Sequence, residues 1–141
     1  MGSTLQSDVP GNIHPITHHF ASVASNGGAA RVAIFKAPQN IRLKSFGVDF
    51  YGADKAVTAT SYRRLALVDG GADGTDTTII SSMNLTTSVA SMGTASGSIA
   101  TANQDIDAGD ILIFSHLTVG GDHNAGTVLP DGAILVDYEL R

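Results

Sequence analysis

The histidines are the first residues whose type and spacing could form a chemical site. His14, His18 and His19 make up the one cluster, and imidazole nitrogens are common zinc ligands. On a strand, His18 and His19 point to opposite faces, so at most one of them can join His14 around a shared ion. His116 and His123 follow about 100 residues later, and no His-x-His pair followed by a Glu completes a cupin-type site. We expect no metal site and interpret these histidines as surface or arm residues.

The segment Asp69–Asp76 combines carboxylates with glycines, which suits a calcium loop. Aligned with an EF-hand loop, Asp69, Asp73 and Gly74 fit positions 1, 5 and 6. Gly71 does not fit position 3, and the bidentate Glu of position 12 is missing. A calcium-binding nonapeptide array needs tandem repeats, which the chain lacks. We expect a solvated turn, with a weak cation site as the alternative.

Catalytic groups do not come together anywhere in the sequence. Glu139 is the sole glutamate, so a glycosidase pair would need aspartates alone. The chain has no Gly-x-Ser-x-Gly elbow and no phosphate-binding Gly-x-x-x-x-Gly-Lys-Ser/Thr loop. It has no cysteine, which excludes a thiolate nucleophile, disulfides and thiolate metal sites. We expect the protein not to be an enzyme and to use no cofactor.

The composition favours a folded protein with the length of one domain. Of the 141 residues, 43% are hydrophobic and 15% are charged, whereas disordered chains combine low hydrophobicity with high charge. No apolar run reaches the ~18 to 20 residues that span a bilayer. Residues Met1–Ser7 lack the basic and apolar regions of an export signal. We expect a soluble protein with no membrane partner.

The charges are unevenly distributed along the chain. The net charge of −5 argues against a nucleic-acid partner held by phosphate contacts. From residue 65 to residue 140 there is no Lys or Arg. We expect the two oppositely charged halves either to match within one domain or to attract each other between copies, head to tail. All basic residues except Arg141 lie between 31 and 64: Arg31, Lys36, Arg42, Lys44, Lys55, Arg63 and Arg64.

The spacing of turn-forming residues along the chain predicts an all-β protein. Residues 1–15 are polar and contain Pro10 and Pro15, which predicts an extended N-terminal arm without a strand. From residue 16 onward, short apolar runs alternate with Gly, Asn, Asp and Pro clusters. The tract 88–98 consists of small residues and fits either a loop or a weak edge strand. We expect strands at 17–25, 31–37, 41–51, 58–68, 77–87, a short one from 99, 111–117 and 134–140.

Two of these segments carry more information than the others. Apolar residues in 41–51 shift from odd to even positions, so we expect a β-bulge or bend near Ser45–Gly47, with Gly47 tolerating unusual dihedral angles. The segment Ile111–Leu117 is apolar on both parities as far as His116, which predicts a strand that is covered on both faces. The parity shift involves Ile41, Leu43, Phe46, Val48 and Phe50.

About eight short strands with connections too brief for crossover helices imply an antiparallel β-sandwich or barrel. We expect a jelly-roll-like sandwich over residues 16–141, behind the arm at 1–15. The strand count and the absence of tryptophan favour this over an immunoglobulin-like sandwich.

Arg63 and Arg64 form the one basic doublet, next to Tyr62. On a strand their guanidinium groups point to opposite faces. We expect one of them to anchor an ion pair near the core and the other to face solvent or a partner. A solvated edge position is the alternative.

The pattern resembles the capsid decoration, or cement, proteins of tailed bacteriophages, which have a jelly-roll core. The likeness covers about residues 16–141, and related patterns occur in other phage head, neck and fibre proteins. The segments that carry it are 37–43 (Ala-Pro-Gln-Asn-Ile-Arg-Leu), 106–114 (Ile-Asp-Ala-Gly-Asp-Ile-Leu-Ile-Phe) and 119–128, which leads into the alternating final strand.

The resemblance implies a non-enzymatic virion protein that is assembled in the host cytoplasm. It would sit as a homotrimer on the outer capsid surface, bind the major capsid protein, and extend its arm to neighbouring subunits. A polar arm without its own core gains order only on another chain, which is compatible with this picture. The expected partner-binding residues are Leu5, Val9, Ile13, His14, Tyr62, Arg63 and Arg64.

The alternative is a carbohydrate- or receptor-binding β-sandwich module of a phage fibre or neck. In that case, loop aspartates and Tyr51 or Tyr62 would contact the sugar. Three tyrosines and no tryptophan make this the poorer interpretation, because sugar platforms usually expose aromatic rings.

Overall fold

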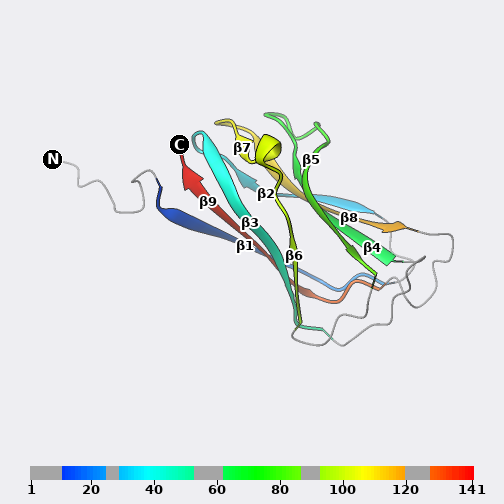
Figure 1. The fold of residues 1–141 in the computed structure, drawn as a ribbon. Helices are drawn as coiled ribbons and strands as arrows, with labels where there is room; N and C mark the ends of the chain where they lie inside the picture. The colour runs from blue at the N-terminus through cyan, green and yellow to red at the C-terminus, as the bar shows by residue number, and fades with distance from the viewer. Residues whose placement is uncertain (1–10, 25–28, 53–61, 87–92, 120–127) are drawn as a thin grey trace.

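The computed structural model describes residues 11–24, 29–52, 62–86, 93–119 and 128–141. Within these ranges the chain forms nine β-strands and one short 3-10 turn (Figure 1). No helix in these ranges has the length and apolar character needed to cross a membrane. The elements are β1 (Ile13–Phe20), β2 (Ala30–Lys36), β3 (Ile41–Phe50), β4 (Tyr62–Asp69), β5 (Thr78–Leu85), β6 (Thr94–Gly97), η2 (Thr101–Asn103), β7 (Asp105–Ile106), β8 (Ile111–Val119) and β9 (Gly132–Leu140).

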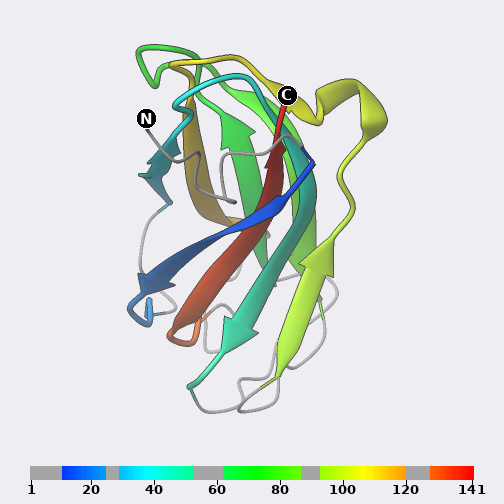
Figure 2. The ribbon, with the colours of Figure 1, turned by 90° about the vertical axis from the view of Figure 1, so that its left-hand side faces the viewer.

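The strands pair in nested order, so that early strands of the chain lie against late ones. β1 pairs with β9, β2 with β8, β3 with β6 and β4 with β5, all antiparallel. Each sheet is completed because β9 also pairs with β3, and β8 also pairs with β4. The first sheet therefore has the order β1-β9-β3-β6, with β7 on β3, and the second has the order β2-β8-β4-β5 (Figures 1 and 2). This arrangement is the eight-stranded, two-sheet jelly roll, and the predicted fold class is confirmed.

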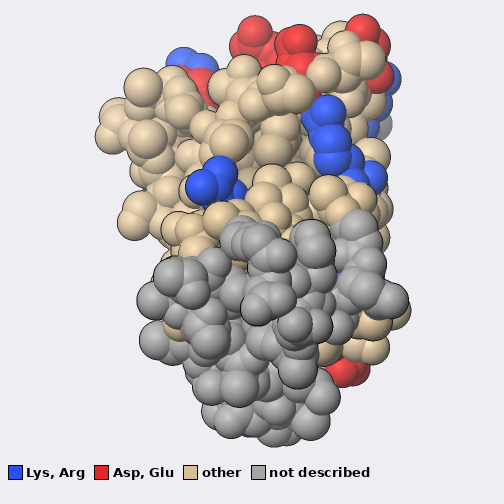
Figure 3. Space-filling view, turned by 90° about the vertical axis from the view of Figure 1, so that its right-hand side faces the viewer, with Lys and Arg blue, Asp and Glu red and all other residues tan. Residues whose placement is uncertain are grey.

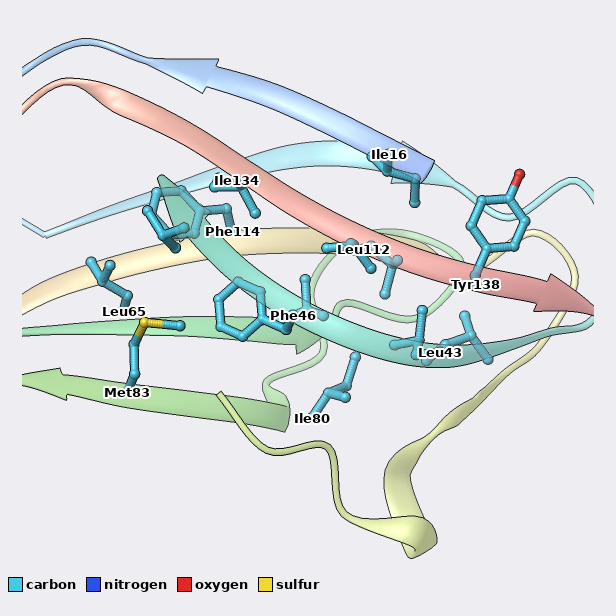
Figure 4. Packing of buried hydrophobic residues seen from close by; sticks show 14 of the residues in the cluster. Ile16, Leu43, Phe46, Leu65, Ile80, Met83, Leu112, Phe114, Ile134 and Tyr138 are labelled. Carbon is cyan, nitrogen blue, oxygen red and sulfur yellow. The ribbon is translucent and has the colours of Figure 1, made fainter. Parts of the chain in front are cut away.

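The core lies between the two sheets. Side chains from the inner faces meet there, and Figure 4 shows Phe46 and Leu43 from one sheet opposite Leu65 and Leu112 from the other. Phe20 stacks on Phe114 with ring centroids 5.5 Å apart. Each fully buried Leu, Ile or Phe side chain stabilises the fold by about 1.5–3 kcal/mol relative to exposure. Alternating apolar residues on each strand therefore supply the sandwich with its main driving force.

The predicted break in β3 is present, one residue before the expected segment. The pairing of β3 with β9 shifts between Leu43, opposite Tyr138, and Ser45, opposite Asp137. Lys44 is the extra residue, and it restores one buried face on both sides of the bulge. The expected role of Gly47 is wrong, because Gly47 pairs regularly within β3 and does not have a positive φ.

The start of the first strand also differs from the prediction. β1 begins at Ile13, so the absence of a strand expected up to residue 15 is wrong for residues 13–15. Pro15 fits because β1 is the edge of its sheet, where a missing N–H breaks no ladder. β1 ends at Phe20, and beyond it Val23 makes one isolated bridge to Leu129.

The small-residue tract and the strand expected from residue 99 turn out differently. Residues 94–97 form the edge strand β6, whereas residues 87–92 lie outside the described ranges. Ile99 is in no strand, because η2 intervenes and the short strand β7 forms only at Asp105–Ile106. Residues 58–61 of the strand expected at 58–68 also lie outside the described ranges.

Candidate interaction face

The two sheets differ in what they present to solvent. The outer side of the first sheet carries ion pairs, as with Arg42, which contacts Asp105 at 2.8 Å, and Lys44, which lies 3.6 Å from Glu139, and it also exposes Ile13 and Leu135. Arg141 also contacts Asp105, at 3.0 Å. These pairs join basic residues to late acidic residues, so part of the charge asymmetry is matched within the chain. On the outer side of the second sheet, a cluster of apolar residues lies between polar ones that include Arg31, Arg64 and Ser115.

The apolar residues on the outer side belong to runs in β4 and β8 in which odd and even positions are both apolar. In β4, Leu65 and Leu67 enter the main core, so Ala66 and Val68 point to the outer side of the sheet, where each is still 5% exposed. In β8, Leu112 and Phe114 enter the core, which turns the residues between and beside them outward. Val68 lies opposite Ile113 in the ladder, and such cross-strand pairs stabilise a sheet. We call this surface the apolar face; it consists of Ala33, Ala66, Val68, Ile79, Ile111, Ile113 and Leu117.

The apolar face is hollowed in two places that meet at Arg31. A hollow of about 150 Å³, the arginine hollow, lies over β4, β5 and β8 between Arg31 and Arg64. A second hollow of about 360 Å³ lies between Arg31 and the turn that contains Asp73. Ile79 lines the first hollow and is 47% exposed. In the described part of the surface, which is mainly the upper half of Figure 3, a few groups of basic atoms lie among uncharged residues, and acidic atoms gather mainly at the upper end.

Neutral groups hold the two arginines of the arginine hollow. Arg31 Nη2 donates to the main-chain carbonyl of Asp76 at 2.6 Å, and Arg64 Nε donates to Asn84 Oδ1 at 3.4 Å. No acidic side chain lines the arginine hollow itself within the described residues. Electrostatically, this surface suits a partner that brings a carboxylate next to an apolar group.

Arg63 and Arg64 lie on opposite faces of β4, as predicted. Arg63 is fully buried, and its Nη2 donates to the carbonyl of Ala24 at 2.9 Å. Its Nη1 lies 3.1 Å from His116 Nδ1. Since a guanidinium only donates, this His116 nitrogen accepts and carries no proton. Burial, then the charge of Arg63, lowers the pKa of His116, and burial lowers the pKa of Arg63. Tyr62, the first residue of β4, is half-buried.

The predicted partner residues near the N-terminus fall into different environments. Ile13 is 52% exposed at the start of β1. His14 faces inward and stacks on Tyr138, with ring centroids 5.1 Å apart, and Phe35 packs on the same tyrosine at 5.2 Å. Burial raises the pKa of Tyr138. Leu5 and Val9 lie outside the described residues.

The carboxylates of the turn after β4 mostly hold the turn itself. Asp69 Oδ1 accepts from the backbone N–H of Gly71 at 2.9 Å. Asp73 Oδ1 accepts from the N–H and the hydroxyl of Thr75, which lowers the pKa of Asp73. Burial, then the charges of Asp69 and other aspartates, raises the pKa of nearby Asp110. Within the described ranges, no three His, Asp or Glu residues are grouped so as to hold a metal ion.

The apolar face is a feature that the sequence predictions above do not include. Its signal was available, because the prediction that 111–117 is covered on both faces already required a second apolar surface. The run Leu65–Val68 carries the same signal on β4. Only the pairing of β4 with β8 shows that the two outward halves adjoin.

Comparisons with known proteins give structural likeness only. No protein-family model matches the chain, and no curated protein matches it. Among solved structures, the chain is similar to those of infectious bursal virus derived T=1 particles (11% identity, TM-score 0.41, 94% of this chain and 32% of that one). It is also similar to the VP2 subviral particle of infectious bursal disease virus (16%, 0.39, 94% and 33%) and to the T13 viral particle (15%, 0.41, 99% and 37%). The chain spans about a third of those chains, and at these TM-scores they carry no functional argument.

Proposed function

We propose that this chain is a non-enzymatic structural protein of a virion, specifically a capsid decoration, or cement, protein. In this proposal it binds the outer shell as an oligomer, a homotrimer, and stabilises the head. The sequence resemblance described above first suggests this role. The jelly roll is compatible with it, since capsid proteins, lectins and cupins share this architecture.

The apolar face is the observation that carries the proposal. An antiparallel sheet that only encloses its own core normally presents a polar outer side to water. Here Ala66, Val68 and Ile113 form a second apolar cluster with Ile111 on the outer side of the sheet; the first three are 4–5% exposed, and Ile79, which lines the same hollow as Ala66 and Val68, is 47% exposed. Apolar surface that is rimmed by polar residues marks a contact with another macromolecule. A protein that acts by association needs such a surface and needs no catalytic group.

In this proposal the protein acts by burying surface area against other subunits and catalyses no reaction. Contact between the apolar face and another subunit removes apolar surface from water at roughly 25 cal/mol per Å². Association costs on the order of 4–15 kcal/mol in lost rigid-body freedom, so one small contact per copy is weak. Repetition by symmetry makes the sum strong. In this proposal residues 1–15 contribute as an arm that adds contacts beyond the sandwich at 16–141.

Two measurements test the proposal. Native mass spectrometry of the purified chain gives its oligomeric state, for which we expect a trimer. Co-sedimentation with undecorated shells, assembled from the major capsid protein of the same phage, should then show saturable binding. Binding that does not saturate, or no binding at all, would exclude the cement role.

A carbohydrate-binding module is the second candidate, and one observation favours it. Tyr51 is 43% exposed and lies beside His19, with ring centroids 6.2 Å apart. Exposed rings of this kind can stack on a sugar face. A glycan array probed with the full chain distinguishes the two candidates, because specific hits that are lost in Tyr51→Ala would support the module and an array without hits would remove it.

A further inference from the structure

We propose that the arginine hollow binds the N-terminal segment, residues 1–10, of a second copy of this chain. Val9 or Leu5 fills the hollow and Asp8 pairs with Arg31 or Arg64. The inference rests on the proposed function, because it identifies which segment of another copy contacts the apolar face when the protein self-associates.

The charge of the hollow supports an acidic occupant. The structure describes four surface arginines, of which Arg42 and Arg141 pair with Asp105. Arg31 and Arg64 instead donate to uncharged oxygens, as described above. A guanidinium gains more from a carboxylate than from an amide or carbonyl oxygen. The two arginines of the hollow are thus the surface arginines, within the described ranges, that still lack an acidic partner.

The size of the hollow fits one apolar side chain. A cavity of about 150 Å³ accommodates a benzene-sized apolar group. The floor is formed by Ala66, Val68 and Ile79, together with Leu117. A Val or Leu side chain matches this floor in size and polarity.

The N-terminal segment has the complementary composition. Its sequence is Met-Gly-Ser-Thr-Leu-Gln-Ser-Asp-Val-Pro, in which Asp8 is the one charged side chain. Leu5 and Val9 are four residues apart, so an extended segment directs both to the same side. Asp8 adjoins Val9 in the sequence, so a segment with Val9 seated in the hollow would bring the carboxylate of Asp8 near Arg31 or Arg64, which line it. Ten extended residues span at most roughly 33–36 Å, more than enough to cross the hollow.

A second copy is a more direct donor than the same chain. The N-terminal segment leads into β1, which begins at Ile13 in the first sheet. The arginine hollow lies on the outer side of the opposite sheet, over β4, β5 and β8. Figure 1 shows the start of β1 at the left of the molecule, with β4, β5 and β8 at the right. A chain that filled its own hollow would have to round the edge of the sandwich.

Disulfide trapping tests the inference, because the chain has no cysteine of its own. One full-length variant carries Val9→Cys, and another, with a different affinity tag, carries Ile79→Cys. The two are mixed under mild oxidation, and linked pairs are counted on a non-reducing gel. Leu135→Cys is the matched control, since Leu135 is 36% exposed on the first sheet. A disulfide requires Cα atoms about 4.4–6.8 Å apart, so only a seated segment reacts efficiently.

We expect the Val9→Cys and Ile79→Cys mixture to give at least about tenfold more linked pairs than the mixture with Leu135→Cys, because seating raises the effective concentration. Equal yields would overturn the inference. The double variant Val9→Cys/Ile79→Cys provides a second readout. Closure within single chains at every concentration would also overturn it, since the chain would then fill its own hollow.

Charge reversal adds a test of the pairing. Arg64→Glu should lower the yield of linked pairs about two- to fivefold, the range for an exposed ion pair, and adding Asp8→Arg should restore it. Failure of the second change to restore the yield would remove the assigned ion pair. The shell experiment separates the two proposals. Shell binding without linked pairs leaves the cement role standing and the inference overturned, whereas linked pairs without shell binding do the reverse.

Discussion

Replacing Arg63 with alanine should destabilise the fold far more than the same change at its neighbour Arg64. Arg63 is fully buried, with hydrogen bonds of 2.9 Å to Ala24 and 3.1 Å to His116. Its removal leaves the part-buried carbonyl of Ala24 and the buried ring nitrogen of His116 without their donor, in addition to a cavity. A buried polar group that loses its partner costs about 1–3 kcal/mol, and the cavity left by a large side chain adds to this, so we expect a loss of about 3–5 kcal/mol. Arg64 makes an exposed contact of 3.4 Å, which is worth about 0–1 kcal/mol.

Urea unfolding followed by circular dichroism measures the difference. With a slope of about 2 kcal/mol per M, Arg63→Ala should lower the midpoint by about 1.5–2.5 M, and Arg64→Ala by less than about 0.5 M. Arg63→Met keeps most of the side-chain volume and should fall between them, because only the hydrogen bonds are lost. Equal midpoints for the two alanine variants would refute the assignment of Arg63 to the interior.

Three further changes test the pH dependence and the packing of the sandwich. The pKa of His116 is lower in the folded than in the unfolded chain, so the unfolded chain binds a proton first and the free energy of unfolding should fall as the pH drops below about 6.5. His116→Asn should remove this pH dependence, which urea midpoints at pH 7.5 and 5.5 measure. An unchanged difference between the two midpoints would contradict the prediction. Gly132→Ala would push a Cβ into the carbonyl of Asp49 and should lower the free energy of unfolding by about 1–3 kcal/mol. Gly47→Ala, whose Cβ would have its nearest neighbour at 3.5 Å, should lower it by less than about 0.5 kcal/mol. Thermal melts measure both, and the reverse order would refute the strand register. Asp105→Asn should cost about 0.2–1 kcal/mol at pH 7, and progressively less as the pH falls from 3.8 through the lowered folded-state pKa, where the carboxylate becomes protonated. A loss that grows at low pH would contradict this.

Local alternation made most of the fold predictable. The shift from Leu43 to Phe46 predicted a bulge because a strand repeats every two residues, and the bulge is at Lys44. The exact residue could not be predicted, since any of several positions in the break restores the buried face. Gly47 was overinterpreted because a glycine in a strand is not always at the irregular position.

Edge strands were less predictable than central ones. Pro15 argues against a strand when only the local sequence is considered, yet it is accommodated at the edge formed by β1. Whether a strand will be an edge depends on the long-range pairing of β1 with β9, which joins residues more than one hundred positions apart. The short strand β6 depends on β3 in the same way.

The candidate site was predictable only in its parts. The doublet of Arg63 and Arg64 predicted opposite environments correctly, because neighbours on a strand alternate. The sequence did not show which arginine is buried, or that Arg31 lies near Arg64 across the sheet. That juxtaposition needs β2, β8 and β4 to lie side by side, a consequence of the jelly-roll pairing.

Quantitative co-sedimentation with undecorated shells is the measurement that tests the central claim most directly. Wild type, Ile79→Lys on the apolar face and Leu135→Lys on the first sheet are compared in parallel. We expect wild type and Leu135→Lys to saturate the shells equally, and Ile79→Lys to lose at least about tenfold in affinity, which corresponds to about 1.4 kcal/mol. No binding by wild type, or equal binding by both lysine variants, would contradict the account.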